Sequence, residues 1–196
     1  MNKLNLATSS LVESARTQQQ FLRFRLLPDL TALIEIEAIG STKDVESERR
    51  RHLRVTELVN IQIDRVVPMP HLPPAVMGVY NWRGEMLWIV DLAMLLGVTT
   101  GRRYRSLQPT IILASATEQG GRATAEDRQE QTIGLVVDEI AEIEWYEPEQ
   151  IRPLEPQRLA ALSTYVRGVW AAVTGEDFLV VDGQAIFDRT DFDADV

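Results

Sequence analysis

Three short segments of the sequence occur twice in the same order, and this internal repeat limits the possible folds more than any other feature. Each segment keeps apolar side chains at matching positions, and the spacing between the last two is nearly the same in both halves. The pairs are residues 55–61 with 137–143, 78–80 with 168–170, and 87–91 with 178–182. One such match would be noise, but three in one order indicate two copies of a single β-rich unit.

The apolar residues follow the period of β-strands in most of the chain. Residues 21–26 alternate apolar and charged side chains, and residues 32–37 resume the pattern after a Pro-Asp turn, which predicts a hairpin. A short helix is expected at 92–96, because Gly97 is a natural residue to end it. Further strands are expected at 55–63, 66–67, 78–82, 86–90, 110–113, 133–137, 140–145, 168–173 and 178–181. Short strands with no long helix between them favour small β-barrels over a parallel α/β sheet.

Polar segments divide the chain into one folded region and its surroundings. We expect a polar leader at 1–20, a folded region at 21–190 and an acidic tail at 191–196. Within the folded region, residues 40–53 are charged and poor in apolar side chains, so they predict an inserted loop. Residues 115–131 are rich in Gly, Glu, Gln and Arg and predict a mobile loop.

Composition excludes several classes of function. The formal net charge is −9, and an acidic chain repels phosphate backbones, so we expect no nucleic-acid partner. The one basic run, Arg49–Arg51, lies among acidic residues and is read as a solvated loop. The chain has no cysteine, which fits a reducing cytoplasm. No apolar stretch approaches the ~20 residues that cross a bilayer, so we expect no membrane insertion and a cytoplasmic location.

The sequence offers no active site. His52 and His71 lack a second histidine at metal-ligand spacing, so we expect no metal site, and no Gly-rich phosphate loop indicates a cofactor. Glu35 and Glu37 share a strand face, and a solvated strand is the simpler explanation of that pair. Three hypotheses follow: a binding adaptor, a β-barrel sensor that binds a small ligand, and, least supported, a hydrolase built on His71 and a nearby acid.

A tight turn carries the composition of a protein interface. Arg83 stands between Trp82 and Gly84, and arginine and tryptophan are the residues that most often anchor protein interfaces. Its planar guanidinium can hold a carboxylate or a row of carbonyls, which a lysine cannot. The alternative is that Arg83 pairs with Glu85 or Asp91 and only closes the turn. The sequence leaves both interpretations open.

At these residues the chain resembles the CheW family, adaptors that couple chemoreceptors to the histidine kinase CheA. The run at 73–92, PPAVMGVYNWRGEMLWIVDL, is similar to the family's G-V-x-N-x-R-G motif and its surroundings. The other similar segments are 21–24, 55–58, 133–138, 149–153 and 165–168. The resemblance covers about residues 21–190.

This resemblance implies a mainly β fold of two intertwined five-stranded SH3-like β-barrels with short helices and a groove between them. It implies a non-catalytic adaptor without a cofactor, whose partners are a methyl-accepting chemoreceptor and a CheA-like histidine kinase. The receptor-binding residues would be Val79, Asn81, Trp82, Arg83 and Gly84. The kinase-binding residues would be Val55, Glu57 and Leu58. The two contacts are expected on separate faces, in receptor arrays on the inner membrane.

Three departures from the family pattern bear on the partners. Trp82 replaces the usual leucine and Trp88 the usual proline, so two aromatic side chains are expected to crowd the receptor-facing turn. The insertion at 40–53 falls near the expected kinase contact. Aromatic variants of this kind suggest pilus-based motility or phototaxis systems.

Overall fold

The computed structural model describes residues 18–41, 50–99, 101, 103–118, 130–154, 164–172 and 175–189. The strands of the first half are β1 (Gln19–Leu27), β2 (Leu30–Glu35), β3 (Glu37–Ser41), β4 (Arg50–Gln62), β5 (Val76–Trp82) and β6 (Glu85–Asp91). Those of the second half are β7 (Leu107–Glu118), β8 (Glu130–Val136), β9 (Glu139–Tyr146), β10 (Val166–Ala171) and β11 (Asp177–Val181). The short helices are η1 (Ile63–Arg65), α2 (Leu92–Leu95), η3 (Pro148–Gln150) and α3 (Gly183–Arg189).

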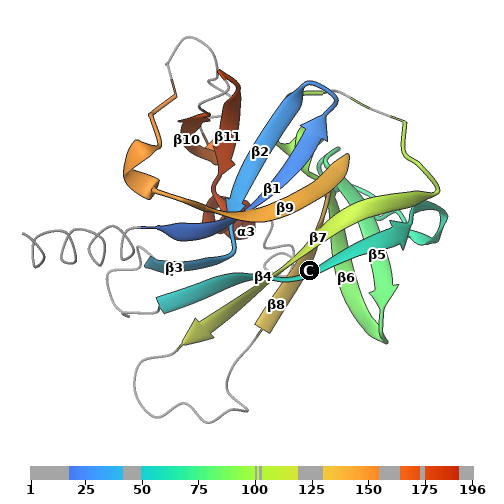
Figure 1. Cartoon of the computed structure of the whole chain (residues 1–196). Helices are drawn as coiled ribbons and strands as arrows, with labels where there is room; N and C mark the ends of the chain where they lie inside the picture. Colours follow the sequence, from blue (N-terminus) through green and yellow to red (C-terminus); the bar gives the residue numbers. More distant parts are fainter. Residues whose placement is uncertain are drawn as a thin grey trace, which may run out of the picture.

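The strands form two sheets that lie next to each other (Figure 1). One sheet has the order β10-β11-β2-β1-β9 and the other the order β3-β4-β7-β8-β6-β5. The β1–β2 hairpin from the start of the chain therefore lies in the same sheet as β9, β10 and β11 from its end. Strands β7 and β8 of the second half lie in the other sheet, between β4 and β6. This confirms the expected mainly β fold of two intertwined units. The first sheet has five strands, and the other has a sixth, β3, at its edge.

The internal repeat is confirmed in detail. The succession β4-η1-β5-β6-α2 recurs as β9-η3-β10-β11-α3. An isolated bridge joins Val67 to Val79 in one half and Arg152 to Val169 in the other. At the matching glycines the backbone of this bridge approaches so closely that an added Cβ would lie 2.1 Å from a carbonyl oxygen at Gly78 and 2.2 Å from one at Gly168. Only glycine fits such an approach, which explains why both copies keep it.

The apolar side chains form three clusters, because most strands bury both faces. A central core lies between the sheets and takes Leu22, Val181, Val90 and Ile111 from the two of them. A smaller cluster inside each unit contains, for example, Phe21 in one and Ile89 in the other. The neighbouring residues Phe21 and Leu22 thus belong to different clusters, as the alternation of a strand requires.

Two segments that we expected to be loops begin and end in strands. Residues 40–41 end β3 and residues 50–53 begin β4, so the predicted insertion at 40–53 is wrong at both ends. Leu53 is buried in the central core beside α3, which gives this charged segment an apolar anchor. Likewise 115–118 belong to β7 and 130–131 to β8. Residues 42–49 and 119–129, the leader before residue 18 and the tail after 189 lie outside the described residues.

Candidate functional site

The Arg83 turn is a two-residue hairpin loop between β5 and β6. Trp82 and Glu85 pair across it, and φ is 55° at Arg83 and 91° at Gly84. Two successive positive φ values are the signature of a type I′ turn, whose twist matches the flanking strands. The Asn81 side-chain oxygen accepts a hydrogen bond of 3.1 Å from the Gly84 N–H. The turn therefore holds Arg83 at the tip in a backbone conformation that residues other than glycine seldom adopt.

The guanidinium of Arg83 is held from two sides. Its two terminal nitrogens donate to the two carboxylate oxygens of Glu57 at 2.8 and 2.9 Å, a two-pronged ion pair. Its central carbon lies 5.0 Å from the centre of the Trp82 ring. We call Arg83, Glu57 and Trp82 the arginine clamp. The Arg83 side chain is 68% exposed, so the clamp presents an oriented guanidinium to solvent.

This geometry corrects two expectations. Arg83 does not pair with Glu85 or Asp91; Asp91 is buried and accepts hydrogen bonds from Tyr104 and the Met94 N–H at the start of α2. The receptor-binding and kinase-binding sets also do not lie on separate faces, because Arg83 from one and Glu57 from the other are in direct contact. The two predicted contacts adjoin at this ion pair.

A β-bulge in β4 aims Glu57 at the hairpin. The register against β7 shifts between Val55, opposite Leu113, and Glu57, opposite Ile112. In a regular strand residues 55 and 57 would share a face, but the extra residue lets Val55 pack on the central core while Glu57 reaches Arg83. Leu58 is 42% exposed. No sequence signal revealed this bulge, which explains why the clamp was missed.

The clamp forms one wall of a shallow hollow of about 310 Å³. Its lining takes side chains from β4, β7 and β8 as well as from the β5–β6 hairpin. Met86 at the rim is 66% exposed. The lining residues are Thr56, Glu57, Trp82, Arg83, Glu85, Met86, Leu87, Ile112, Ala114 and Thr132. A partner can therefore meet an oriented cation beside a depression of mixed polar and apolar lining, a combination found in protein interfaces.

Val79 of the predicted receptor set and Trp88, one of the aromatic departures, are not among the residues that line the hollow. Val79 is half-buried in β5 and pairs with Trp88 of β6. Trp88 packs against the central core and does not crowd the turn, so that expectation is wrong. Only Trp82 of the two aromatic departures belongs to the clamp.

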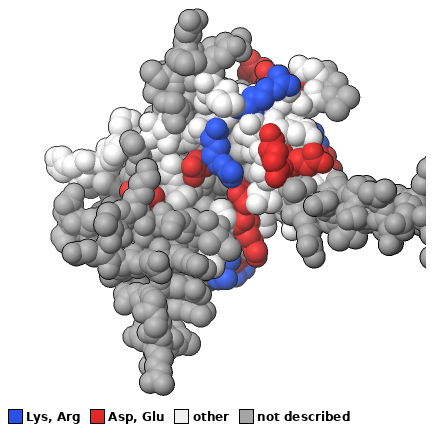
Figure 2. All heavy atoms as spheres, turned by 90° about the vertical axis from the view of Figure 1, so that its left-hand side faces the viewer, with Lys and Arg blue, Asp and Glu red and all other residues white. Residues whose placement is uncertain are grey.

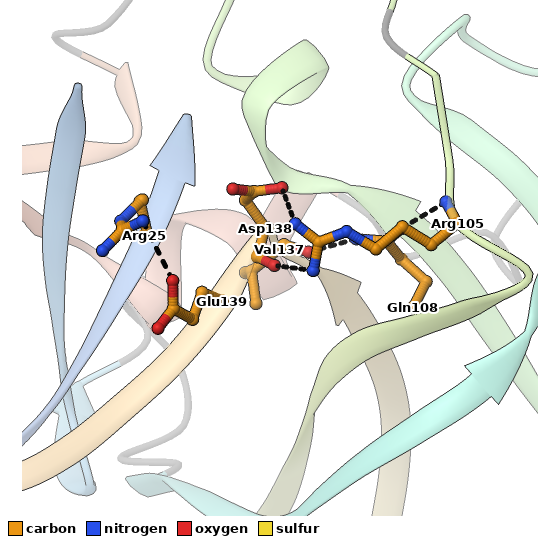
Figure 3. A network of polar contacts seen from close by, with 6 residues as sticks. All are labelled: Arg25, Arg105, Gln108, Val137, Asp138 and Glu139. Carbon is orange, nitrogen blue, oxygen red and sulfur yellow. Dashed lines mark hydrogen bonds and ion pairs between the residues drawn. The ribbon is translucent and has the colours of Figure 1, made fainter. Parts of the chain in front are cut away.

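A polar network fixes the joint between the two units (Figure 3). Arg105 donates to the Asp138 carbonyl at 3.3 Å and to its carboxylate at 3.2 Å, and the Gln108 amide donates to the Val137 carbonyl at 2.6 Å. Arg25 of β1 forms an ion pair of 3.0 Å with Glu139. Residues 137–138 connect β8 to β9, so the contacts of Arg105 and Gln108 tie this connection to the start of β7. The Arg25–Glu139 ion pair joins β1 to β9 within one sheet.

A second and larger hollow, about 550 Å³, lies at the mouth of the second unit. Its lining is charged and open, with Arg25 already paired to Glu139 and Arg23 contacting Glu142 and Glu144. A small-molecule site is usually apolar with few polar groups, so this hollow does not favour the sensor hypothesis. On the face shown in Figure 2, acidic and basic side chains of the described residues are interleaved without a basic stripe.

Comparison with known proteins places the chain in a family. The model of the CheW-like domain matches residues 53–191. The chain belongs to the CheW family. It is 28% identical over 120 residues to the chemotaxis protein CheW of Rhizobium meliloti, covering 61% of this chain and 68% of that protein. It is also 28% identical over 126 residues to a probable chemotaxis protein CheW of Rhizobium etli, covering 64% and 72%.

A solved structure has the same fold. The scaffolding protein TtCheW from Thermoanaerobacter tengcongensis matches with a TM-score of 0.54 and 18% identity, over 83% of this chain and 88% of that one. In the described part of this CheW-family chain no helix is long and apolar enough to cross a membrane. The same residues contain no group of three or more His, Asp or Glu side chains that could hold a metal ion.

Proposed function

We propose that this CheW-family protein is a non-catalytic adaptor that couples methyl-accepting chemoreceptors to a CheA-type histidine kinase. The setting would be cytoplasmic receptor arrays that serve chemotaxis, phototaxis or pilus-based motility. Family membership supports the adaptor role, and the names of the rhizobial relatives support a role in chemotaxis. The observation that carries the proposal is the arginine clamp, since it presents an oriented cation beside a hollow with both polar and apolar lining.

The receptor would contact Val79 and the turn from Asn81 to Gly84, and the kinase would contact Val55, Glu57 and Leu58. Because Glu57 and Arg83 hold each other, the two contacts adjoin. A substitution at either residue should therefore weaken the binding of both the receptor and the kinase, since each side chain orients the other. This replaces the expectation that the two contacts lie on separate faces.

Reconstitution from purified receptor cytoplasmic domain, kinase and adaptor tests the proposal. Arg83→Ala should weaken binding by about 2 kcal/mol or more, the range for anchor arginines. Arg83→Lys should restore binding in part, because lysine keeps the charge and loses the two-pronged geometry. Arg65→Ala removes an exposed arginine of η1 that forms no ion pair among the described residues and is the matched control. Unchanged affinity for both partners in Arg83→Ala would refute the assignment of the clamp.

A further inference from the structure

Strand β9 is the last strand of its sheet, and no described residue pairs with its outer edge. It pairs with β1 on one side, from Gln19 opposite Tyr146 to Arg25 opposite Glu139. In the described ranges no other strand and no loop forms a backbone hydrogen bond with residues 139–146. Unpaired N–H and C=O groups along a strand edge are a template for another extended chain.

One half of this edge is protected against such pairing and the other half is not. A β-bulge lies where Leu22 pairs with Ile143 and Phe24 with Ile140, so the first half of β9 is irregular. The second half, from Ile143 to Tyr146, pairs regularly with β1 and contains neither proline nor lysine, the residues that commonly block an edge.

Two large apolar side chains stand exposed on this regular half. Ile143 is 51% exposed and Trp145 is 60% exposed. They are two residues apart, so they share one face of the strand. Exposed tryptophan beside an exposed branched side chain is costly in water and is characteristic of a protein contact. The sequence pattern predicts a strand at 140–145 but indicates no role for these two side chains.

The charge around the edge selects the kind of partner. Residues 139–149 contain five carboxylates, and the two arginines of β1 that face them, Arg23 and Arg25, leave an excess of three negative charges. A second copy of this chain would bring acidic strands side by side, and like charges across a strand pair are destabilising. A basic segment would instead be attracted.

We propose that the edge of β9 from Ile143 to Tyr146 docks an extended segment of a partner protein in which basic and apolar residues alternate. The segment adds to the five-stranded sheet as a sixth strand. Its backbone pairs with the free edge, its apolar side chains cover Ile143 and Trp145, and its basic side chains meet the carboxylates. This site is separate from the arginine clamp. The proposal goes beyond the coupling function, and either one can be refuted without the other.

A labelled eight-residue peptide that alternates lysine with valine is the probe, and fluorescence anisotropy measures its binding to the full chain. Trp145→Ser should weaken binding at least about tenfold, as expected for loss of an aromatic anchor. Leu107→Ser removes a side chain that is 54% exposed at the start of β7 and should leave binding unchanged. Thermal unfolding of both variants should match the wild type, because the replaced side chains lie mostly in solvent.

Backbone methylation of the peptide tests the strand geometry itself. Alternate N–H groups of a strand point to opposite sides, so N-methylation of one alternate set should abolish binding and methylation of the other should not. Equal effects of both sets would overturn strand addition, because attraction by charge or side chains alone would not distinguish them. Absence of saturable binding, equal affinity for Trp145→Ser, or self-association of the chain through Trp145 would each overturn the proposal.

Discussion

Replacing Arg83 by alanine distinguishes a binding role of this side chain from a structural one. The substitution removes the ion pair with Glu57 and the stacking on Trp82. With 68% of the Arg83 side chain and 33% of the Glu57 side chain exposed, water and salt screen most of the attraction. Exposed ion pairs contribute about 0.2–1 kcal/mol and an exposed cation–π contact about 0.5–1 kcal/mol. The free energy of unfolding should therefore fall by only about 1 kcal/mol.

For a chain of 196 residues, this loss corresponds to a decrease in Tm of about 2–4 °C. Circular dichroism at low and high salt measures it, and the difference should shrink at high salt because salt screens the ion pair. The free energy of unfolding of the double variant Arg83→Ala, Glu57→Ala should fall by less than the sum of the decreases in the two single variants, since each single change removes the same contact. A loss above about 3 kcal/mol would exceed what exposed contacts supply and would show that Arg83 is mainly structural.

Three further predictions test the fold. Val90→Ala and Val181→Ala, at matching positions of the repeat and both in the central core, should each lower the free energy of unfolding by about 1–3 kcal/mol in urea titrations, and a Tm within a degree of wild type would contradict the burial. Gly168→Ala should destabilise the protein clearly while Gly101→Ala does not, because only the first places a Cβ against a carbonyl oxygen. Burial raises the pKa of Glu35 from its ordinary value of 4.5, with a guanidinium partly offsetting the effect. The folded state then holds the proton more tightly than the unfolded state, so stability relative to Glu35→Gln should fall as pH rises above 4.5, and a rise would refute this.

The repeat in the sequence predicted the architecture because it reflects backbone requirements that survive substitution. Gly78 lies against the carbonyl of Val67, and Gly168 lies against the equivalent carbonyl of Arg152. Asp91 and Asp182 each accept a hydrogen bond from the first turn of the helix that follows. Such requirements are local, so a short motif carries them. The hairpin at the start of the chain was predictable for the same reason, because apolar and charged side chains alternate along β1 and indicate which face of the strand is buried.

The errors arose where distant strands decide the outcome. The charged segment at 40–53 looked like a loop because its apolar content is low, yet its last residue, Leu53, is buried in the central core. The clamp depends on the bulge in β4, a property of its pairing with β7 that spacing along the chain does not show. The exposure of Trp145 likewise follows from the position of β9 at the sheet edge.

The intertwined topology bears directly on how an adaptor of this kind can work. The hairpin β1–β2 pairs with β9 and β11, while the central core takes side chains from both sheets, so neither unit can shift without disturbing buried contacts of the other. The hydrogen bonds of Arg105 and Gln108 to residues 137 and 138 also hold the connection between β8 and β9. Binding surfaces are most precise when rigid elements carry them. The arginine clamp on one unit and the β9 edge on the other are therefore held at a fixed separation, which a protein needs if it is to set two partners in a defined arrangement.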